Sequence, residues 1–493
     1  MKDSEESAQE RRHALLFETQ TYADRLAMVS VVVEPSSHGW DAMKIYTPER
    51  VQQMVRRVLL EWGLGQKRSD APLADLIVPG SKVLLKPNWV VDRNAGPGGV
   101  DCLYTNQEVI LAVLKEVLIA KPGRVTIGDA PIQSCNLSAL VSDDFRSRVQ
   151  YLAHKTGIEI EVIDFRRTLM SRGLIHSSVK AGMRDMHHFV LFDLGPDSLL
   201  EPLCTRAASF RVGDYDPREL ARTHCAGHHQ YLLCREAFDA DVVISLPKLK
   251  MHCKAGLTGA LKNLVGLNGN KDFLPHYRFG GSAKNGDCYE GWSLGRELSE
   301  QFEDLANHRL NLLDYSIWKN AARAFRLVSG GAARMGGEWY GNDTVWRMVL
   351  DLNRILIYGN LDGSMSDTPR RVFYSLTDAL ICGEGNGPLR PTPRPLGAMT
   401  FGSSPVACDL VHAALLRVDA ALVPLLREAV RQFRWPLVGA AFSPMVLVNG
   451  ERLALQQVAG QYGVNALPPS GWRSHMEWTA VRTGGVSKAV QAR

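Results

Sequence analysis

The chain has 493 residues, 45% hydrophobic and 22% charged, so it can bury ordinary cores and does not have the composition of a disordered protein. Its net charge of +5 is small for this length and gives no global case for nucleic-acid binding. No run reaches the roughly 18 apolar residues that a membrane span needs, and the charged start is unlike a secretory signal. The composition predicts a cytoplasmic protein of roughly two or three domains.

The nine cysteines follow no recognisable bridging pattern. No two are spaced as C-x-x-C, and their number is odd. An odd count in a long chain argues against a disulfide framework, and an iron–sulfur cluster needs a tight run of cysteines. We therefore expect neither.

Strands and helices are predicted to alternate from residue 28 onward. The pattern indicates strands at 30–33, 83–85, 124–127 and 159–163, and helices over 48–62, 106–120 and 145–156. Thr47 and Pro48 suit the N-cap and the first position of the first helix. Such alternation predicts an α/β fold with mostly parallel sheets and helices on both faces.

The second half repeats this pattern around two irregular segments. Residues 165–235 are expected to form an insertion, and residues 270–342, rich in Gly, Asn and aromatics, a long excursion. The run DVVISL (241–246) is typical of a buried central strand. A helix over 345–357, strands at 379–382 and 398–401, and a helix over 405–416 follow. We expect a tail at 1–27, two lobes over 28–240 and 241–467 with a cleft between them, and an extension at 468–493.

The segment Leu246–Asp272 carries the strongest chemical signal. Between Val242 and Lys271 there are five lysines, one histidine and no acidic residue. The segment follows a predicted strand, and ligands in open α/β sheets bind beyond the carboxyl ends of strands. Its spacing predicts a helix, with Leu257, Leu261 and Leu264 on one face and Lys254, Thr258 and Lys262 on another. Glycines at such a helix start would favour an anion, although a solvated basic helix is the simpler alternative.

Side chains at the ends of two other predicted strands are candidates for the same site. Lys86 and Asn88 follow the strand at 83–85, although Pro87 and Asn88 also suit a plain turn. Asp129 follows the strand at 124–127 and has three possible roles: to orient a lysine, to bind a metal, or to cap a turn.

Two later motifs add acidic and amide groups. In GEGNGP (383–388), Glu384 and Asn386 lie among glycines that let a backbone approach a ligand, but no dinucleotide fingerprint follows. In GSSPVACD (402–409), Ser404 suits a helix cap, and Asp409 either faces the cleft or favours the helix dipole. Asp129, Glu384 and Asp409 are the candidate ligands for a divalent metal, which prefers such oxygen ligands.

A histidine-rich segment is a weaker candidate for a functional site, as a possible metal site. His224 and His228 would share a helical face, with Cys225 and His229 beside them. No second ligand pair at the spacing of a structural site is visible nearby in the sequence. We therefore expect these histidines to lie on the surface or to pack in the core rather than to bind a metal.

Six pieces, taken in order, resemble the family catalogued as domain of unknown function 362. They are LLKPNWV (84–90), VTIGDAP (125–131), DADVVISLPKLKMHCKAGLTGALKNLVGL (239–267), DLNRIL (351–356), TDALICGEGNGP (377–388) and GSSPVACD (402–409). The resemblance implies an α/β fold and little settled function. Many relatives carry a ferredoxin-like cysteine cluster, which this chain lacks. The fold is also distantly similar to nickel-dependent lactate racemases, but likeness of fold does not establish a reaction.

Two functions are compatible with these residues. The first is an enzyme acting on an anionic carboxylate or phosphate, with His252, Lys248 or Lys262 as catalytic acid or base. The ligand would be held by the remaining candidates, which are Lys86, Asn88, Lys250, Thr258, Asn263, Glu384 and Asn386. The second is a non-catalytic anion-binding or accessory protein. Nucleic acid is not an expected partner, because residues 242–271 contain no aromatic side chain.

Overall fold

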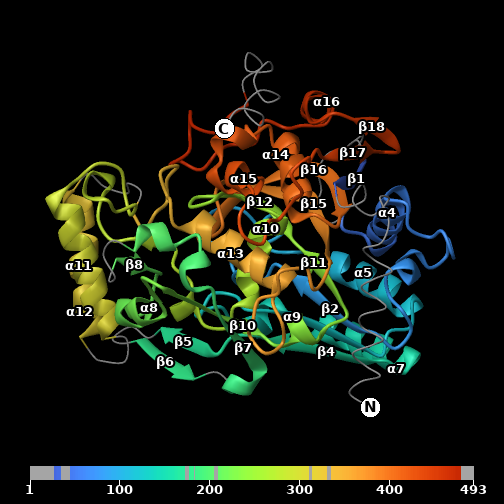
Figure 1. Ribbon diagram of the computed structural model, residues 1–493, viewed down its shortest axis with the longest axis horizontal. Helices are drawn as coiled ribbons and strands as arrows, with labels where there is room; N and C mark the ends of the chain where they lie inside the picture. The colour runs from blue at the N-terminus through green and yellow to red at the C-terminus, as the bar shows by residue number, and fades with distance from the viewer. Residues whose placement is uncertain are drawn as a thin grey trace.

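The computed structural model describes residues 27–34, 45–172, 177–181, 184–204, 209–309, 314–329 and 335–478. One large mixed sheet runs through the centre of the molecule (Figure 1). Its main path is β18 (Glu451–Leu453), β17 (Met445–Val448), β1 (Met28–Val33), β16 (Arg390–Gly402), β15 (Phe373–Asn386), β11 (Val242–Leu246), β2 (Lys82–Pro87), β3 (Arg124–Asp129) and β4 (Glu159–Asp164).

Most neighbours in this sheet are parallel. The five strands from β15 to β4 all run in one direction, and β1 is parallel to β17. The antiparallel pairs on this path are β1 with β16, β15 with β16, and β17 with β18. The predicted α/β fold with mostly parallel strands is therefore confirmed.

Two apolar cores lie on the two faces of the sheet. In β2, Val83 and Leu85 face one core and Leu84 the other, because successive side chains of a strand alternate. The first core is covered by α4 (Pro48–Glu61), α5 (Gln107–Ile119) and α7 (Asp143–Thr156). The second is covered by α13 (Val345–Tyr358) and α14 (Pro405–Leu415) (Figure 1).

The long helices α5 and α14 begin at a capping side chain, and Ser404 is the predicted one. The Asn106 side chain accepts a hydrogen bond from the Glu108 backbone, and the Ser404 side chain accepts one from Ala407. Thr47 is the N-cap of α4 but makes no side-chain cap hydrogen bond. None of the helices in the described residues is long and apolar enough to cross a membrane.

The sheet crosses the boundary suggested at residue 240. β11, after that boundary, pairs with β2 before it, while β1 pairs with β16 and β17. The division into two lobes stays a prediction about which parts fold independently. Most of the predicted tail, and residues 479–493, lie outside the described residues. Earlier in the predicted extension, Trp472 is buried and donates from Nε1 to the Cys253 carbonyl at 2.7 Å.

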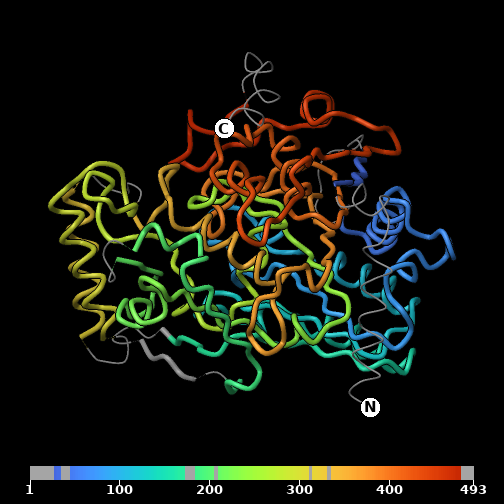
Figure 2. Tube along the Cα trace, in the orientation of Figure 1, coloured from blue at the N-terminus to red at the C-terminus, as the bar shows by residue number. Residues whose placement is uncertain are grey.

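The predicted insertion and excursion contain their own small elements. Residues 165–235 form two small sheets, one of β7 (Phe189–Asp193), β10 (His228–Cys234) and β9 (His224–Cys225) and one of β5 (Thr168–Arg172) and β6 (Ser177–Ala181). The excursion carries α11 (Leu294–His308) and α12 (Tyr315–Val328), which lie side by side at the edge of the molecule (Figure 2). The two segments are joined where β14 (Tyr277–Arg278) pairs with β8 (Phe210–Arg211).

The predicted helix through Lys254 and Lys262 is wrong. The segment forms a hairpin of β12 (Lys248–His252) and β13 (Gly256–Thr258), followed by the short α10 (Ala260–Asn263). The sequence KLKMH alternates polar and apolar residues with the period of a strand, and β12 adds to the sheet beside β15. Gly256 adopts a φ of 84°, which a residue with a side chain rarely does.

The remaining helices are short. They are α6 (Leu137–Leu140), α8 (Pro217–Thr223), α9 (Glu236–Asp239), α15 (Pro424–Ala429) and α16 (Leu455–Gln461). The predicted helical face shared by His224 and His228 is also wrong, because these residues lie on the neighbouring strands β9 and β10.

Candidate functional site

The ends of β2 and β3 meet in a buried ion pair. Lys86 Nζ lies 2.7 Å from Asp129 Oδ1, 2.8 Å from the Pro87 carbonyl and 3.2 Å from Asn263 Oδ1. Asp129 also accepts hydrogen bonds from the Trp89 and Ala130 backbone at 2.6 and 2.9 Å. Burial raises the pKa of Asp129 and lowers that of Lys86, and each charge opposes the shift of the other. Asp129 therefore orients a lysine, one of its three predicted roles.

Asn263 and Asn88 connect this pair to a second lysine. Asn263 Oδ1 accepts from Asn88 Nδ2 at 3.1 Å, and Asn263 Nδ2 donates to Ser245 Oγ at 2.9 Å. Asn88 Oδ1 in turn accepts from Lys250 Nζ at 2.8 Å. Four of the predicted site residues, Lys86, Asn88, Lys250 and Asn263, thus form one hydrogen-bonded chain.

Lys248 is paired separately. Its Nζ lies 2.9 Å from Asp378 Oδ2 and 2.7 Å from the Tyr46 hydroxyl, and both charged side chains are fully buried. Asp378 also accepts from Tyr46 at 2.9 Å and from the Asn106 backbone at 3.1 Å. The charge of Lys248 is therefore compensated within the protein.

One face of the β12–β13 hairpin gathers polar side chains. Lys248, Lys250 and His252 alternate along β12 and therefore share a face. Thr258 is the cross-strand partner of Lys250, so its side chain lies on that face as well. Thr258 is 2% exposed, and its hydroxyl has no hydrogen-bond partner among the described residues.

Lys250 and Lys262 lack a compensating carboxylate. Among the described residues, no acidic oxygen lies within 4.0 Å of either ammonium group, although both side chains are buried. Burial, with Lys262 and Lys248 nearby, holds the pKa of Lys250 well below its usual value. Burial, with Lys254 and Lys86 nearby, lowers the pKa of Lys262 to about 8. In the described part of the chain Lys271 also lacks a carboxylate, but its ammonium group donates to three backbone carbonyls; Lys250 and Lys262 are therefore the two uncompensated amines that face the polar side of the hairpin.

His252 has a defined tautomer. Its Nδ1 accepts hydrogen bonds from the Lys254 and Ala255 backbone at 3.0 and 3.2 Å, so the neutral ring carries its proton on Nε2. Burial, with the surrounding lysines, holds the pKa of His252 well below its usual value. At neutral pH the ring is therefore a hydrogen-bond donor from Nε2.

Three predicted residues are engaged elsewhere. Glu384 and Asn386 lie where β15 turns into β16 and accept hydrogen bonds from the Leu467 and Ser470 backbone, both at 2.9 Å. Asp409 accepts from the Ala260 and Leu261 backbone at 2.7 and 3.0 Å, and so caps α10 from α14. The structure does not bring these carboxylates together with Asp129 around a common point.

The sequence analysis missed several members of the cluster. Asp378 and Tyr46 hold Lys248, and Lys271 Nζ donates to the backbone carbonyls of Asn268, Val265 and Ala130. Gly266 lies so close to the first ion pair that a Cβ there would overlap Asp129 Oδ1. Asp378 belongs to the TDALIC motif (377–382), where apolar residues follow it, and nothing in that sequence predicts that it forms an ion pair.

The lowered lysine pKa values predict a specific pH dependence of stability. The pKa of Lys262 is about 8 and burial lowers that of Lys271 to about 7, whereas both are 10.5 in an unfolded chain. Between pH 7 and 10.5 the unfolded state therefore binds more protons, and the free energy of unfolding contributed by these groups rises with pH. Urea unfolding at pH 7.5 and 9 should show a smaller rise for Lys262→Met than for the wild type. Equal rises in the two proteins would contradict the assignment.

The hairpin part of this site lies within a stretch of the chain that matches a family model. The family model described as "Domain of unknown function (DUF362)" matches residues 174–414, which confirms the resemblance and includes the hairpin, α10, β15 and β16. The thylakoid-associated protein sll1697 of Synechocystis sp. is 23% identical over 359 residues, which are 73% of this chain and 70% of that protein.

Two solved structures were also found. A protein from Thermotoga maritima has 11% identity and a TM-score of 0.30, covering 74% of this chain and 58% of its own. The lactate racemase apoprotein from Thermoanaerobacterium thermosaccharolyticum has 11% identity and a TM-score of 0.29, covering 79% of this chain and 58% of its own. The chain thus spans 58% of the length of each of these proteins. Because both TM-scores are low, the fold is assigned from the strand pairing described above.

Proposed function

We infer that this chain, whose residues 174–414 match the domain of unknown function 362, is an enzyme that binds an anionic small molecule at Lys250, Lys262 and Thr258. The observation that carries the proposal is the contrast between two kinds of buried lysine. Lys86 and Lys248 each lie against a carboxylate, at 2.7 and 2.9 Å, whereas Lys250 and Lys262 have none within 4.0 Å among the described residues. Burying a cation without a counter-charge is costly, so a ligand carboxylate or phosphate would relieve that cost.

The unpartnered Thr258 hydroxyl supports the same location. A buried polar group without a hydrogen bond costs about 1–3 kcal/mol, and such groups in native proteins call for an explanation. Thr258 lies directly across the hairpin from Lys250, so one anion can accept from both side chains. Lys262, which is 9% exposed, and the half-buried Asn88 form the solvent-facing edge of the cluster.

A lysine is better suited than His252 to act as the base. The Nδ1 lone pair of His252 is occupied by two backbone N–H groups, so His252 would serve as a neutral donor from Nε2. The Lys250 ammonium group has three protons: it donates two to Asn88 Oδ1 and the Leu103 carbonyl, and the third is left for the anion. Lys262, whose pKa burial lowers to about 8, is then the amine whose neutral form would take a proton from a substrate, for instance from the carbon next to a carboxylate.

The alternative is a protein that binds or delivers an anion without chemistry. It requires Lys250, Lys262 and Thr258 but no base. Native mass spectrometry of the gently purified full chain, with metal analysis, would identify a co-purifying anion. Turnover of that anion by the wild type, abolished in Lys250→Met and strongly reduced in His252→Asn, supports the enzyme. Binding without turnover in any protein supports the alternative.

Anion binding itself can be tested with inorganic phosphate and acetate. One of the two anions should raise the melting temperature of the wild type. Lys262→Met should weaken its affinity roughly 10–100-fold, the equivalent of one lost charge-assisted hydrogen bond. Lys82→Met is the matched control, because Lys82 lies at the other, exposed end of β2 and pairs with Asp239. Equal affinity of the Lys262→Met variant and the wild type would remove the proposed ligand site.

Thr258→Val is expected to separate function from stability. The change keeps the shape of the side chain and removes the unpartnered hydroxyl, so the ligand-free protein should become more stable by about 1 kcal/mol. The affinity for the anion should fall at the same time. Urea unfolding and calorimetric titration of the same samples measure both effects. A loss of stability would mean that the hydroxyl has a structural partner.

A cytoplasmic location and the absence of nucleic acid among the partners belong to the same proposal. They rest on the small net charge and on the lack of aromatic residues between 242 and 271. Cell fractionation and a binding assay with single-stranded DNA test them.

A further inference from the structure

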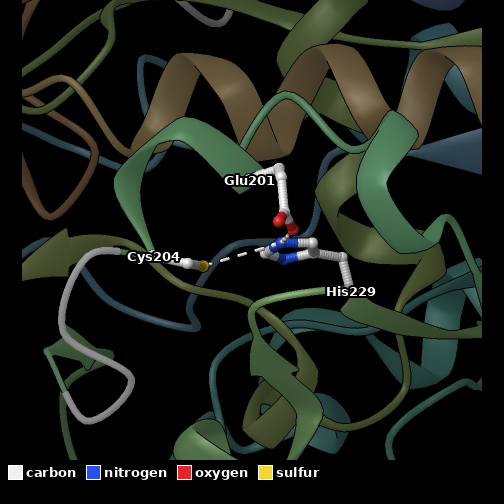
Figure 3. A group of neighbouring side chains, drawn as sticks. All are labelled: Glu201, Cys204 and His229. Atoms are coloured by element: carbon white, nitrogen blue, oxygen red, sulfur yellow. Dashed lines mark hydrogen bonds and ion pairs between the residues drawn. The ribbon is translucent and has the colours of Figure 1, made fainter.

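Three side chains outside the lysine cluster converge in the predicted insertion. Glu201 and Cys204 belong to the helical turn η4 (Glu201–Leu203) and the residue after it, and His229 lies on β10. Figure 3 shows the carboxylate and the thiol directed toward the same edge of the His229 ring. Glu201 Oε2 lies 3.0 Å and Cys204 Sγ 3.6 Å from His229 Nε2. One ligand atom from each residue lies within 4.8 Å of the other two.

The orientation of His229 is fixed by a second histidine behind it. His224 Nδ1 lies 3.3 Å from His229 Nδ1, and His224 Nε2 lies 3.0 Å from the Phe273 carbonyl. His224 is fully buried, which favours the neutral ring. Because a carbonyl can only accept, the single proton of His224 is on Nε2, and its Nδ1 must accept from His229. The proton of a neutral His229 is therefore on Nδ1.

This assignment leaves an unexplained contact at the far end. Three contacts run in series, from the Phe273 carbonyl to His224, from His224 to His229, and from His229 to Glu201. Both ends of the series are acceptors, and two neutral imidazoles supply only two protons. The Nε2 lone pair of His229 then faces a carboxylate oxygen at 3.0 Å, and the single proton of the Cys204 thiol, 3.6 Å from Nε2, cannot also bridge that nitrogen to the carboxylate. A cation at this point satisfies the nitrogen, the carboxylate and the sulfur together.

We propose that Glu201, Cys204 and His229 bind a divalent zinc ion. Zinc takes thiolate, imidazole and carboxylate ligands at about 2.0–2.3 Å, so its ligand atoms are separated by roughly 3–4 Å in a tetrahedron. The observed separations of 3.0 and 3.6 Å already approach this spacing. A ligating histidine normally donates its other N–H to a fixed acceptor, the part that His224 plays here. On binding, the Cys204 thiol loses its proton to solvent and the sulfur becomes the ligand.

The proposed zinc site lies beside a surface cavity. Glu201 also lines a surface cavity of about 550 Å³, whose wall includes Arg347, Arg354 and Arg431. Three protein ligands leave one position of a tetrahedron for water or for an anion that enters from this cavity. This zinc site is independent of the proposed function at Lys250, because it shares no residue with that cluster.

The experiment uses the full chain, first treated with a chelator and then titrated with Co²⁺ as a spectroscopic substitute for Zn²⁺. One Co²⁺ should bind per chain with the near-ultraviolet charge-transfer band of a cobalt–thiolate bond. Cys204→Ser should lose that band, and its Zn²⁺ affinity, measured by competition, should fall by roughly 100-fold or more, since even outer-shell changes cost 10–100-fold. Glu201→Gln should keep the band with weaker affinity.

Two control variants lie on the other face of the same hairpin. Cys225 and His228 are cross-strand partners, one residue away from the pair formed by His224 and His229, so their side chains point the opposite way. Cys225→Ser and His228→Gln should keep both the band and the affinity. Zn²⁺ should also raise the melting temperature of the wild type but not that of Cys204→Ser. The rise in the wild type can be measured even if one of the variants folds poorly. A band lost in Cys225→Ser, or a wild type that binds no Co²⁺ and holds a doubly protonated His229, would overturn the proposal.

Discussion

Replacing Gly266 by alanine is expected to lower the free energy of unfolding by about 3–5 kcal/mol, the usual cost of disrupting a buried ion pair. A Cβ at this position would overlap Asp129 Oδ1 and lie 2.7 Å from Lys86 Nζ. The two ends of the pair are held by β2 and β3 and by backbone hydrogen bonds, so neither can move away cheaply. Urea unfolding measures the loss of stability. The affinity for the anion should fall as well, because Lys86 is linked through Asn263 and then Asn88 to Lys250.

Gly460 provides the matched control. It lies in helix α16, and a Cβ there would meet no atom within 4 Å. Gly460→Ala should be neutral or slightly stabilising, since alanine is favoured over glycine in a helix. If the two alanine variants unfolded at the same urea concentration, the close approach of Gly266 to the ion pair would contribute nothing to the free energy of unfolding.

The second large effect is expected at Asp378. Asp378→Leu leaves the ammonium group of Lys248 fully buried with only the Tyr46 hydroxyl as partner. Removing one member of a buried pair typically costs about 3–5 kcal/mol, because the remaining charge is uncompensated. The double variant Lys248→Met with Asp378→Leu removes both charges and should recover a large part of that loss.

An exposed ion pair between β2 and α9 serves as the comparison. Lys82 and Asp239 lie 2.9 Å apart with side chains about half exposed, and such pairs are worth about 0–1 kcal/mol. Asp239→Leu should therefore change stability far less than Asp378→Leu. A double variant as unstable as Asp378→Leu alone would show that lost packing around β15, rather than the isolated charge of Lys248, causes the effect.

Much of the fold could be predicted because its signals are local. The strands β2, β3 and β11 are short apolar runs, and helices such as α5 and α14 begin at capping residues. Parallel strands end at the same edge of a sheet, so the proximity of Lys86 and Asp129 followed from their positions at strand ends. The hairpin was missed because the leucines of residues 257–264 also match a helical period. The alternation of KLKMH, which specified the strand, spans only five residues.

The composition of the site could be predicted only in part, because its partners come from distant segments. Tyr46 and Asp378 reach Lys248 from 202 and 130 residues away, and neither lies in a motif that suggests an ion pair. The histidine segment drew attention at His224 and His229, but their acidic and sulfur partners lie on a helical turn more than twenty residues earlier. Spacing within one segment carries no information about such contacts.

The position of β1 has a consequence for synthesis of the chain. This strand, MVSVVV, is almost entirely buried between β16 and β17, and its contact with Phe401 spans 371 residues. At roughly 5–20 residues per second, the ribosome needs roughly 20–70 seconds to deliver that partner. During this interval the nascent chain presents an apolar strand with both edges open, which is a template for aggregation.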